Sequence, residues 1–325
     1  MAWSRWIVAW MVVALGCSFA SRAHADDVLV TGFFDNRIAR FDEATGAYRG
    51  DFIAPGSGGL SNPHGMTFGP DGNLYVTSVG TNSVLRYHGT TGAFIDAFVP
   101  SGSGGVSRPS ALTFGPDNNL YVSGSDTGGG VYRYNGATGA FMGVFVPGSS
   151  GGLTRPHGLA FGPDANLYVN SSDDSSVLRY HGTTGAFIDA FVPGKSGGLA
   201  TPYQGLTFDP HGRLLVGGFD SHNVVRYDAS TGSFIDSIGG NGLGRTEGVR
   251  VGRDGSLYVA SQANNSILRF DAVDGAFLGT FASGAGMVDG PVDILFITPV
   301  PEPSLVLLVG FAAVGAWTAR RARKR

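Results

Sequence analysis

Two histidines and one glutamate occupy equivalent positions in a repeated stretch of this sequence. His64 stands in PHGMTF directly after a proline, His157 stands in PHGLAF in the same way, and Glu247 has the matching place in TEGVRV. Imidazole nitrogens and carboxylate oxygens are common protein ligands of divalent cations. If the fold brings the three side chains together, they could hold one metal ion, such as zinc or calcium, with a position left open for water.

The stretch around these residues is part of a longer repeat that indicates the fold. The units align with spacings of 46, 47, 47, 43 and 45 residues on Phe68, Phe114, Phe161, Phe208, Val251 and Phe296. A repeat of this length is typical of one blade of a β-propeller. In one unit, four short strands are expected at 64–68, 73–78, 83–87 and 93–99, with Gly, Asp and Pro in the turns between them.

The two ends of the repeat region complement each other. Segments 27–32, 37–41 and 47–52 have the patterns of a second, third and fourth strand without a first, and a matching first strand appears at 291–297. Pairing these strands would close a ring and remove open sheet edges. We therefore predict an all-β fold over residues 26–298: a six-bladed β-propeller of four-stranded antiparallel blades, closed by pairing the N-terminal strands with the C-terminal strand.

The first strands of a propeller line its central channel, so the residues that begin them should converge at the channel mouth. These residues are His64, Ser110, His157, Gln204, Glu247 and Val292. The three candidate metal ligands come from every second blade, which would give a tripod. Ser110, Gln204 and the adjacent Tyr203 are candidate ligand-binding residues. Alternatively, these polar groups only face water, and the second histidine reflects duplication, because segments 87–98 and 180–191 are nearly identical.

Acidic side chains are expected on the loops between second and third strands, on the same face as the long Gly/Ser-rich blade connections. Asp126, Asp173 and Asp220 could contact the hydroxyl groups of a ligand there; alternatively, they are solvated loop tips. His88 and His181 are expected to be exposed turn residues. The tight turns of the opposite face contain the turn-forming residues Asp71, Asp117, Asp164 and Asp254.

An N-terminal targeting segment is predicted at residues 1–25. Arg5 precedes an apolar run at 7–15, and the small-residue triplet that ends at Ala25 fits cleavage of a Sec signal peptide. The lone Cys17 lies in this segment, so the mature chain would contain no thiol and no disulfide. The alternatives are a membrane helix and a lipoprotein cleavage before Cys17.

The C-terminal residues 299–325 have a second set of targeting features. Pro301, Glu302 and Pro303 precede an apolar run at 305–319, and five basic residues end the chain. The run is short for a transmembrane helix, and its basic end would stay in the cytoplasm. This order resembles the PEP-CTERM sorting signal of Gram-negative bacteria. The resemblance implies an exosortase as partner, transient anchoring in the inner membrane, and delivery to the cell envelope or an exopolysaccharide-rich extracellular matrix; an ordinary C-terminal anchor is the alternative.

The central region resembles NHL-repeat propellers, through NRIARFDEATGAY at 36–48 and the later SVLRY and TGAFI segments. NHL units usually have an acidic residue after the second strand, whereas this chain has YVTS, YVSG, YVNS, LVGG and YVAS there. Among NHL propellers, the peptidyl-hydroxyglycine amidating lyases bind zinc through histidines from alternate blades, a likeness that extends to His64 and His157 only. Gluconolactonase-type propellers bind metal through Glu, Asn and Asp, a pattern that Glu247 alone fits.

Composition narrows the function further. The formal net charge is −3 and no basic stripe lies outside the C-terminal tail, so nucleic acid is not an expected partner. Since no helices are expected, a phosphate-binding loop that opens a helix and an H-E-x-x-H zinc helix have no place in the fold. We favour an exported binding protein whose loop-rich face takes a polysaccharide, peptide or protein ligand. The alternative is a metal-dependent lyase or lactone hydrolase, for which the sequence identifies no catalytic residue.

Overall fold

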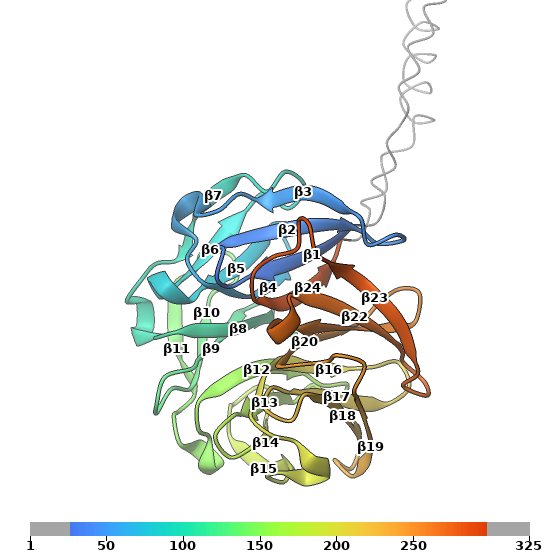
Figure 1. Cartoon of the computed structure of the whole chain (residues 1–325). Helices are drawn as coiled ribbons and strands as arrows, with labels where there is room; N and C mark the ends of the chain where they lie inside the picture. The colour runs from blue at the N-terminus through green and yellow to red at the C-terminus, as the bar shows by residue number, and fades with distance from the viewer. Residues whose placement is uncertain (1–26, 298–325) are drawn as a thin grey trace, which may run out of the picture. The chain divides into compact units, whose positions relative to one another are not determined.

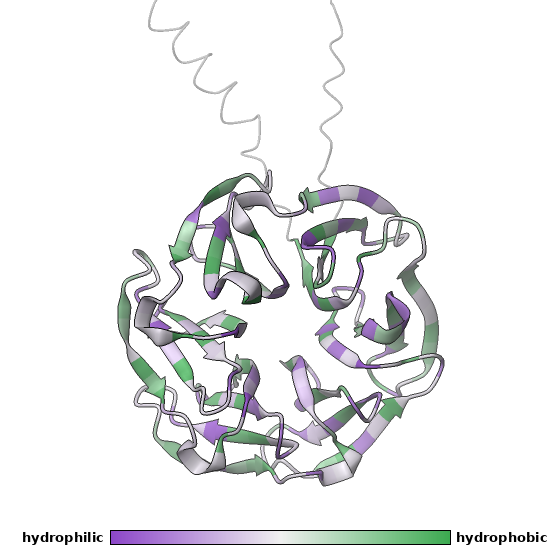
Figure 2. Ribbon diagram, turned by 60° about the vertical axis from the view of Figure 1, so that its left-hand side comes forward, coloured by the Kyte–Doolittle hydropathy of each residue, from purple (hydrophilic) through white to green (hydrophobic). Residues whose placement is uncertain are grey.

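The computed structural model describes residues 27–297, which form six four-stranded antiparallel sheets. Figure 1 shows the chain passing from sheet to sheet, and Figure 2 shows the sheets arranged around a central axis. Neighbouring inner strands contact one another all the way round the ring. The predicted six-bladed β-propeller is therefore confirmed.

Each blade contains one strand at each of four positions, counted outward from the axis. The inner strands are β4 (Pro63–Phe68), β8 (Pro109–Phe114), β12 (Pro156–Phe161), β16 (Pro202–Phe208), β20 (Thr246–Val251) and β24 (Pro291–Phe296). The second strands are β1 (Asp27–Gly32), β5 (Leu74–Ser78), β9 (Leu120–Gly124), β13 (Leu167–Ser171), β17 (Arg213–Gly218) and β21 (Ser256–Ser261). The third strands are β2 (Arg37–Asp42), β6 (Ser83–Tyr87), β10 (Val131–Tyr134), β14 (Ser176–Tyr180), β18 (Asn223–Asp228) and β22 (Ser266–Asp271). The outer strands are β3 (Tyr48–Ile53), β7 (Phe94–Val99), β11 (Phe141–Val146), β15 (Phe187–Val192), β19 (Phe234–Gly239) and β23 (Phe277–Ser283).

One blade is assembled from the two ends of the described chain, in the order β24-β1-β2-β3. Val30 of β1 lies opposite Ile294 of β24, and both side chains are fully buried in one apolar cluster with Tyr258 of the preceding blade. Leu29, on the other face of β1, packs with Leu74 of the following blade. The shared blade therefore contacts both of its neighbours, and the predicted closure of the ring is confirmed.

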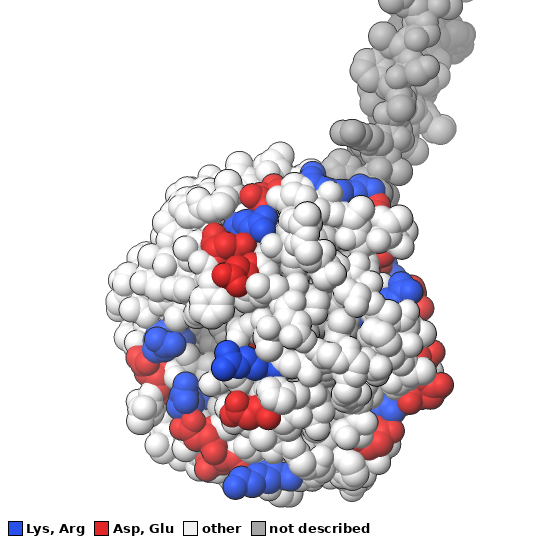
Figure 3. All heavy atoms as spheres, in the orientation of Figure 1, with Lys and Arg blue, Asp and Glu red and all other residues white. Residues whose placement is uncertain are grey.

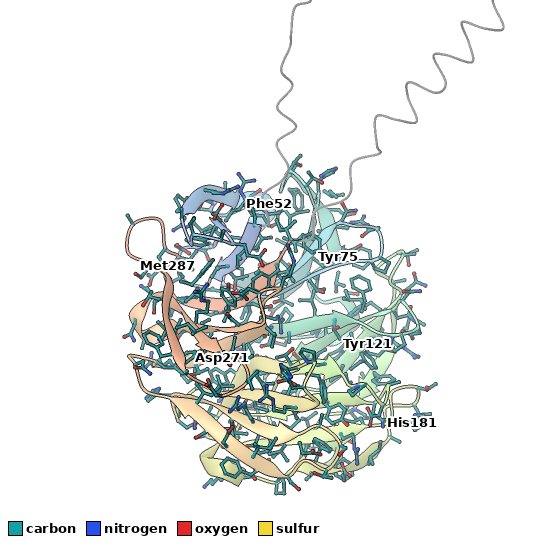
Figure 4. The ribbon with its side chains drawn as sticks, turned by 90° about the vertical axis from the view of Figure 1, so that its right-hand side faces the viewer. Phe52, Tyr75, Tyr121, His181, Asp271 and Met287 are labelled. Atoms are coloured by element: carbon teal, nitrogen blue, oxygen red, sulfur yellow. The ribbon has the colours of Figure 1, made fainter. Side chains whose placement is uncertain are left out.

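Aromatic side chains fill the wedges between blades. Tyr75 packs edge-to-face on Phe98 of its own blade and on Phe114 of the next, with ring centroids 4.9 and 5.0 Å apart. The Tyr75 hydroxyl donates a hydrogen bond of 3.0 Å to the turn residue Asp71. Tyr121, labelled together with Tyr75 in Figure 4, makes the same contacts in the following blade. The equivalent hydrogen bonds reach Asp117, Asp164 and Asp254, so these aspartates have the structural role predicted for them.

The blade connections contain short 3-10 turns that fit closely against the next blade. These turns are η1 (Ser57–Gly59), η3 (Ser103–Gly105), η4 (Ser150–Gly152) and η5 (Ser196–Gly198). Two further 3-10 turns, η2 (Val79–Thr81) and η6 (Gln262–Asn264), lie in the loops between second and third strands. The carbonyl of Ser57 accepts a hydrogen bond from the Tyr87 hydroxyl at 2.8 Å. Gly58 has a φ of 63°, and a Cβ there would lie 2.1 Å from the Phe94 ring. Only glycine fits this position, which explains the recurring SGG sequence.

The turns between third and outer strands contain the two histidines predicted to be exposed. His88 and His181 are both solvent-exposed, and Figure 4 shows His181 at the periphery. No helix within residues 27–297 has the length and apolar character needed to cross a membrane. The predicted signal peptide with its cleavage site at Ala25, and the sorting signal with its apolar run at 305–319, lie outside the described residues.

Ring closure through β24 predicts a large loss of stability when its packing is removed. Ile294→Ala deletes buried methyl groups from the shared blade, so we expect the free energy of unfolding to fall by about 2 to 5 kcal/mol in urea denaturation. Val273, which is 61% exposed, provides the control, and Val273→Ala should change the free energy by less than about 0.5 kcal/mol. Equal effects of the two substitutions would contradict closure through β24.

Candidate functional site

Six residues in the left-handed backbone conformation surround the channel mouth, one directly before each inner strand. They are Asn62, Arg108, Arg155, Thr201, Arg245 and Gly290, with φ angles between 42° and 66°. Asparagine and glycine adopt this conformation readily, whereas an arginine or threonine does so at a cost of about 1 kcal/mol or more. The sharp change of direction brings the chain from the blade connection into the inner strand, and it places three arginines at the rim of the channel.

Hydrogen bonds between blades hold the first turn of each inner strand in place. The Thr77 hydroxyl donates to the Ser110 carbonyl at 2.7 Å, and the Ser123 hydroxyl donates to the His157 carbonyl at 2.6 Å. Gly65 follows His64 in β4, and a Cβ on it would lie only 2.8 Å from the Ser110 carbonyl oxygen. The inner strands therefore lie very close together. There is little room for a side chain at the position of Gly65, and the residue before it, His64, projects into the channel mouth instead.

The two channel histidines are joined by a serine and a glutamine. Ser110 Oγ lies 2.9 Å from His157 Nδ1 and 3.2 Å from His64 Nδ1, and the two ring centroids are 5.8 Å apart. His64 Nδ1 is also 3.2 Å from Gln204 Oε1. Each of the two histidine side chains is only 6% exposed. The structure thus brings together four of the predicted site residues: His64, Ser110, His157 and Gln204.

Two carboxyl groups complete the buried polar cluster on the other side of Gln204. Asp293 accepts a hydrogen bond from Gln204 Nε2 at 3.2 Å and forms an ion pair of 3.1 Å with Arg250. Glu247 accepts hydrogen bonds of 3.4 Å from the Gln204 backbone and from the Gln262 side chain. Both carboxyl groups are buried, so their environment decides their charge.

Burial opposes the charged forms of His64, His157 and Glu247, whereas Asp293 lies in an ion pair with Arg250. Desolvation lowers the pKa of His64 to about 4, although its hydrogen bond to Gln204 acts in the other direction. Desolvation also lowers the pKa of His157 well below its usual value, assisted by His64, Arg155 and Arg108. The pKa of Glu247 is raised well above its usual value, first by burial and then by repulsion from Asp293.

Aromatic rings extend from the histidine pair across the mouth. Tyr203 stacks on His157 with ring centroids 4.3 Å apart, and Phe219 follows on Tyr203 at 4.5 Å. Tyr203 is an additional residue in β16: the paired positions Pro202 and Leu206 are four apart, whereas the equivalent positions Pro156 and Leu159 in β12 are three apart. On the opposite side of the pair, Phe33 contacts His64 edge-on at 6.0 Å. The adjacent Phe34 is 57% exposed.

The predicted acidic loop residues lie beside the rim of the channel, each with a partner. Asp126 pairs with Arg108 at 3.6 Å and Asp173 with Arg155 at 3.3 Å. Asp220 accepts a hydrogen bond of 2.6 Å from Thr201. Figure 3 shows acidic and basic side chains side by side on the face that it draws. The loops therefore present paired charges next to the exposed Phe34 and the half-buried Tyr203 and Phe219.

The predicted tripod of His64, His157 and Glu247 is engaged in these hydrogen bonds. Residues 27–297 contain no group of three or more His, Cys, Asp or Glu side chains that could hold a metal ion. Each histidine has its Nδ1 within hydrogen-bond distance of Ser110, and Glu247 accepts hydrogen bonds from the Gln204 backbone and the Gln262 side chain. Metal binding by these three side chains stays a prediction.

Sequence analysis missed several residues of the site, and some of them had a visible signal. Asp293 replaces the glycine or alanine that follows the channel residue in the other five inner strands. Arg108, Arg155 and Arg245 precede their strands at the position where Asn62 and Gly290 suit a left-handed backbone. The pairing of Arg250 with Asp293 had no signal in the sequence because two different blades supply the partners, and the stack of Phe219 on Tyr203 joins β16 to the loop after β17 through an inserted residue.

Comparisons with known proteins give the fold. No protein-family model and no curated protein matches this sequence. Among solved structures, the chain is similar to a chain of the crystal structure of a nidogen/laminin complex, with a TM-score of 0.68 and 16% identity over 84% of this chain and 99% of that chain. It is also similar to a protein of unknown function from Bacteroides caccae, with a TM-score of 0.63 and 15% identity over the same shares. These likenesses support the propeller architecture.

The stability of the protein in mild acid tests the burial of the neutral histidines. Because the pKa of His157 is lowered in the folded protein, the unfolded chain binds a proton below pH 6.5 that the folded protein does not bind. The stability from this effect is complete above pH 6.5 and falls by up to about 1.4 kcal/mol per pH unit as the pH decreases. We expect His157→Gln to flatten the fall in the free energy of unfolding between about pH 7 and about pH 5, measured with urea.

The exposed His181 gives a matched control, since His181→Gln should keep the slope of the wild type. Glu247 contributes a slope of the opposite sign. Its pKa is raised in the folded protein, so above pH 4.5 the folded chain keeps a proton that the unfolded chain releases, and the free energy of unfolding falls as the pH rises. Each variant is therefore compared with the wild type at the same pH. A slope in His157→Gln equal to that of the wild type would contradict the burial of a neutral imidazole.

Proposed function

We propose that this protein is an exported, non-catalytic binding protein, and that the channel mouth with its surrounding loops is its binding face. The observation that carries the proposal is the concentration of aromatic and arginine side chains around one end of the channel. Phe34, Tyr203 and Phe219 lie there with Arg108 and Arg155. Aromatic residues and arginine supply most of the binding energy in protein recognition sites.

The structural comparison supports a binding role in general terms. The propeller fold is shared with a chain of a nidogen/laminin complex, which is an assembly of two proteins. The fold by itself hosts many functions, so the argument rests on the residues of the mouth. The ligand classes that suit such a face are a polysaccharide, a peptide or another protein.

The family, the export and the sorting of the protein are inferred from the sequence of the repeats and of the two ends. We infer NHL-type repeats from the SVLRY and TGAFI segments, export from the signal peptide that ends at Ala25, and sorting by an exosortase from Pro301, Glu302 and Pro303. The protein would then reach the cell envelope or the extracellular matrix after transient anchoring in the inner membrane. A ligand-binding propeller in that place would connect matrix components.

The sorting step has a direct test in cells. We expect Pro301→Ala with Pro303→Ala to block removal of the C-terminal segment, because the change destroys the motif on which the resemblance to a sorting signal rests. Mass spectrometry of the cell-associated protein would then find the full C-terminal segment, whereas the wild type lacks it. An unchanged C-terminus and an unchanged location in the double variant would contradict sorting by this motif.

Binding at the mouth has a test with a matched control. Purified mature protein is screened on arrays of bacterial polysaccharide fragments and of peptides, and the affinity of each hit is measured by calorimetry. We expect Phe34→Ala to weaken binding at least about tenfold, because exposed aromatic anchors typically contribute this much. Phe94, which is 42% exposed on the outer strand β7, provides the control, and Phe94→Ala should leave the affinity unchanged.

Two outcomes would overturn the proposal. One is the absence of any hit on both arrays. The other is a hit whose affinity survives Phe34→Ala but falls with Phe94→Ala, since this result would place the ligand on the outer strands rather than at the channel mouth.

A further inference from the structure

The hydrogen bonds in the channel decide which nitrogen of each histidine carries a proton. Gln204 Nε2 donates to the Asp293 carboxylate, which orients the amide so that its oxygen faces His64. An amide oxygen only accepts, so His64 Nδ1 must be the protonated nitrogen. The ring is neutral because burial lowers its pKa, and its Nε2 is therefore an acceptor.

Ser110 links the protonation of His157 to that of His64. Its hydroxyl lies within hydrogen-bond distance of Nδ1 of both rings, and the His64 nitrogen is already a donor. Among the hydrogen bonds of the described residues, His157 Nδ1 is the one remaining acceptor for the hydroxyl proton of Ser110, so we assign His157 Nδ1 as an acceptor. In a neutral imidazole the proton then resides on Nε2. His157 Nε2 is buried and has no hydrogen-bond partner within residues 27–297.

A buried N–H without a partner destabilises the folded state, which makes it a marked exception in a folded protein. The charges around this N–H indicate what would satisfy it. Arg108 and Arg155 stand two residues before the channel residues Ser110 and His157, and their ion pairs with Asp126 and Asp173 are long, at 3.6 and 3.3 Å. The acids inside the channel are already engaged: Asp293 is paired with Arg250, and Glu247 accepts hydrogen bonds from Gln204 and Gln262.

We propose that the channel mouth binds a carboxylate group of the ligand, which accepts a hydrogen bond from His157 Nε2 and is further held by Arg155 and Arg108. This assignment rests on the proposed binding function and specifies the chemistry of its ligand. Arginine suits a carboxylate because its planar N–H groups match the two oxygens. On binding, Arg108 and Arg155 would exchange their present partners, Asp126 and Asp173, for the carboxylate of the ligand.

Access to the N–H requires a movement of Tyr203. This ring stacks on His157 and is half-buried, and it comes from the additional residue of β16, next to a register shift in the sheet. Bulged strands are frequent beside functional sites, where the extra residue redirects a side chain. Tyr203→Ala would remove the cover, so small carboxylates should bind at least as tightly to this variant as to the wild type.

The protonation pattern can be measured without a ligand. In ¹H–¹⁵N correlation spectra of histidine-labelled mature protein, assigned with His64→Gln and His157→Phe, we expect a protonated Nε2 in His157 and a protonated Nδ1 in His64. Ser110→Ala should remove the constraint on His157 and change the ratio of its tautomers, whereas the signals of His181 stay the same. A protonated Nδ1 in His157, or protons on both nitrogens, would overturn the proposal.

Binding is tested with glucuronate and with N-acetylaspartate amide, which present the carboxylate on a sugar and on an amino acid, and methyl glucoside serves as the neutral control. We expect the two acids to shift the His157 Nε2–H signal, and Arg155→Gln to weaken the binding about tenfold. Arg269→Gln, which changes an arginine paired with Asp254 near the opposite face, is the control and should have no effect. The tighter of the two acids identifies the source of the carboxylate.

A shift with methyl glucoside as large as with the acids, or equal effects of the two arginine substitutions, would overturn the carboxylate assignment. These outcomes differ from failure of the proposed function. A macromolecular ligand that still depends on Phe34 while neither acid binds would leave the mouth as the binding face and remove only the inference about its chemistry.

Discussion

The close approach of the six inner strands is the constraint on which the rest of the structure depends. A Cβ added to Gly205 would lie 2.4 Å from the carbonyl of Glu247, and one added to Gly248 would lie equally close to the carbonyl of Val292. The ring can close only if small residues stand at this level, or if a larger residue is matched to its surroundings. Asp293 is such a case, because Arg250, Gln204 and backbone N–H groups surround its carboxylate.

This crowding determines the chemistry of the channel. Side chains that would be solvated at a wide opening are buried here, and each must find its partner among the others. Burial lowers the pKa of His64 and His157 and raises the pKa of Glu247, and Asp293 is paired with Arg250. The hydrogen-bond network therefore fixes the direction in which each buried polar group can donate or accept.

The six blades share one pattern of packing contacts, whereas the residues proposed to bind a ligand differ from blade to blade. The Tyr75 type of contact, with an aspartate at the turn and phenylalanines on both sides, recurs with little change and supports the ring. Arginines in a left-handed conformation, the inserted Tyr203 and the exposed Phe34 each belong to particular blades. Because repetition explains the common features, the blade-specific ones are the better guide to function.

The sequence by itself determined the architecture and the circle of residues at the mouth. Spacing and turn chemistry are local properties, so the repeat length gave the blades, the incomplete first unit gave the closure through β24, and the aligned strand starts gave His64, Ser110, His157 and Gln204 as neighbours. Only the tertiary structure decided what these neighbours do. Burial, the pairing of Asp293 with Arg250, and the single proton of Ser110 between two imidazoles depend on distances between blades, and no local pattern in the chain encodes a distance of that kind.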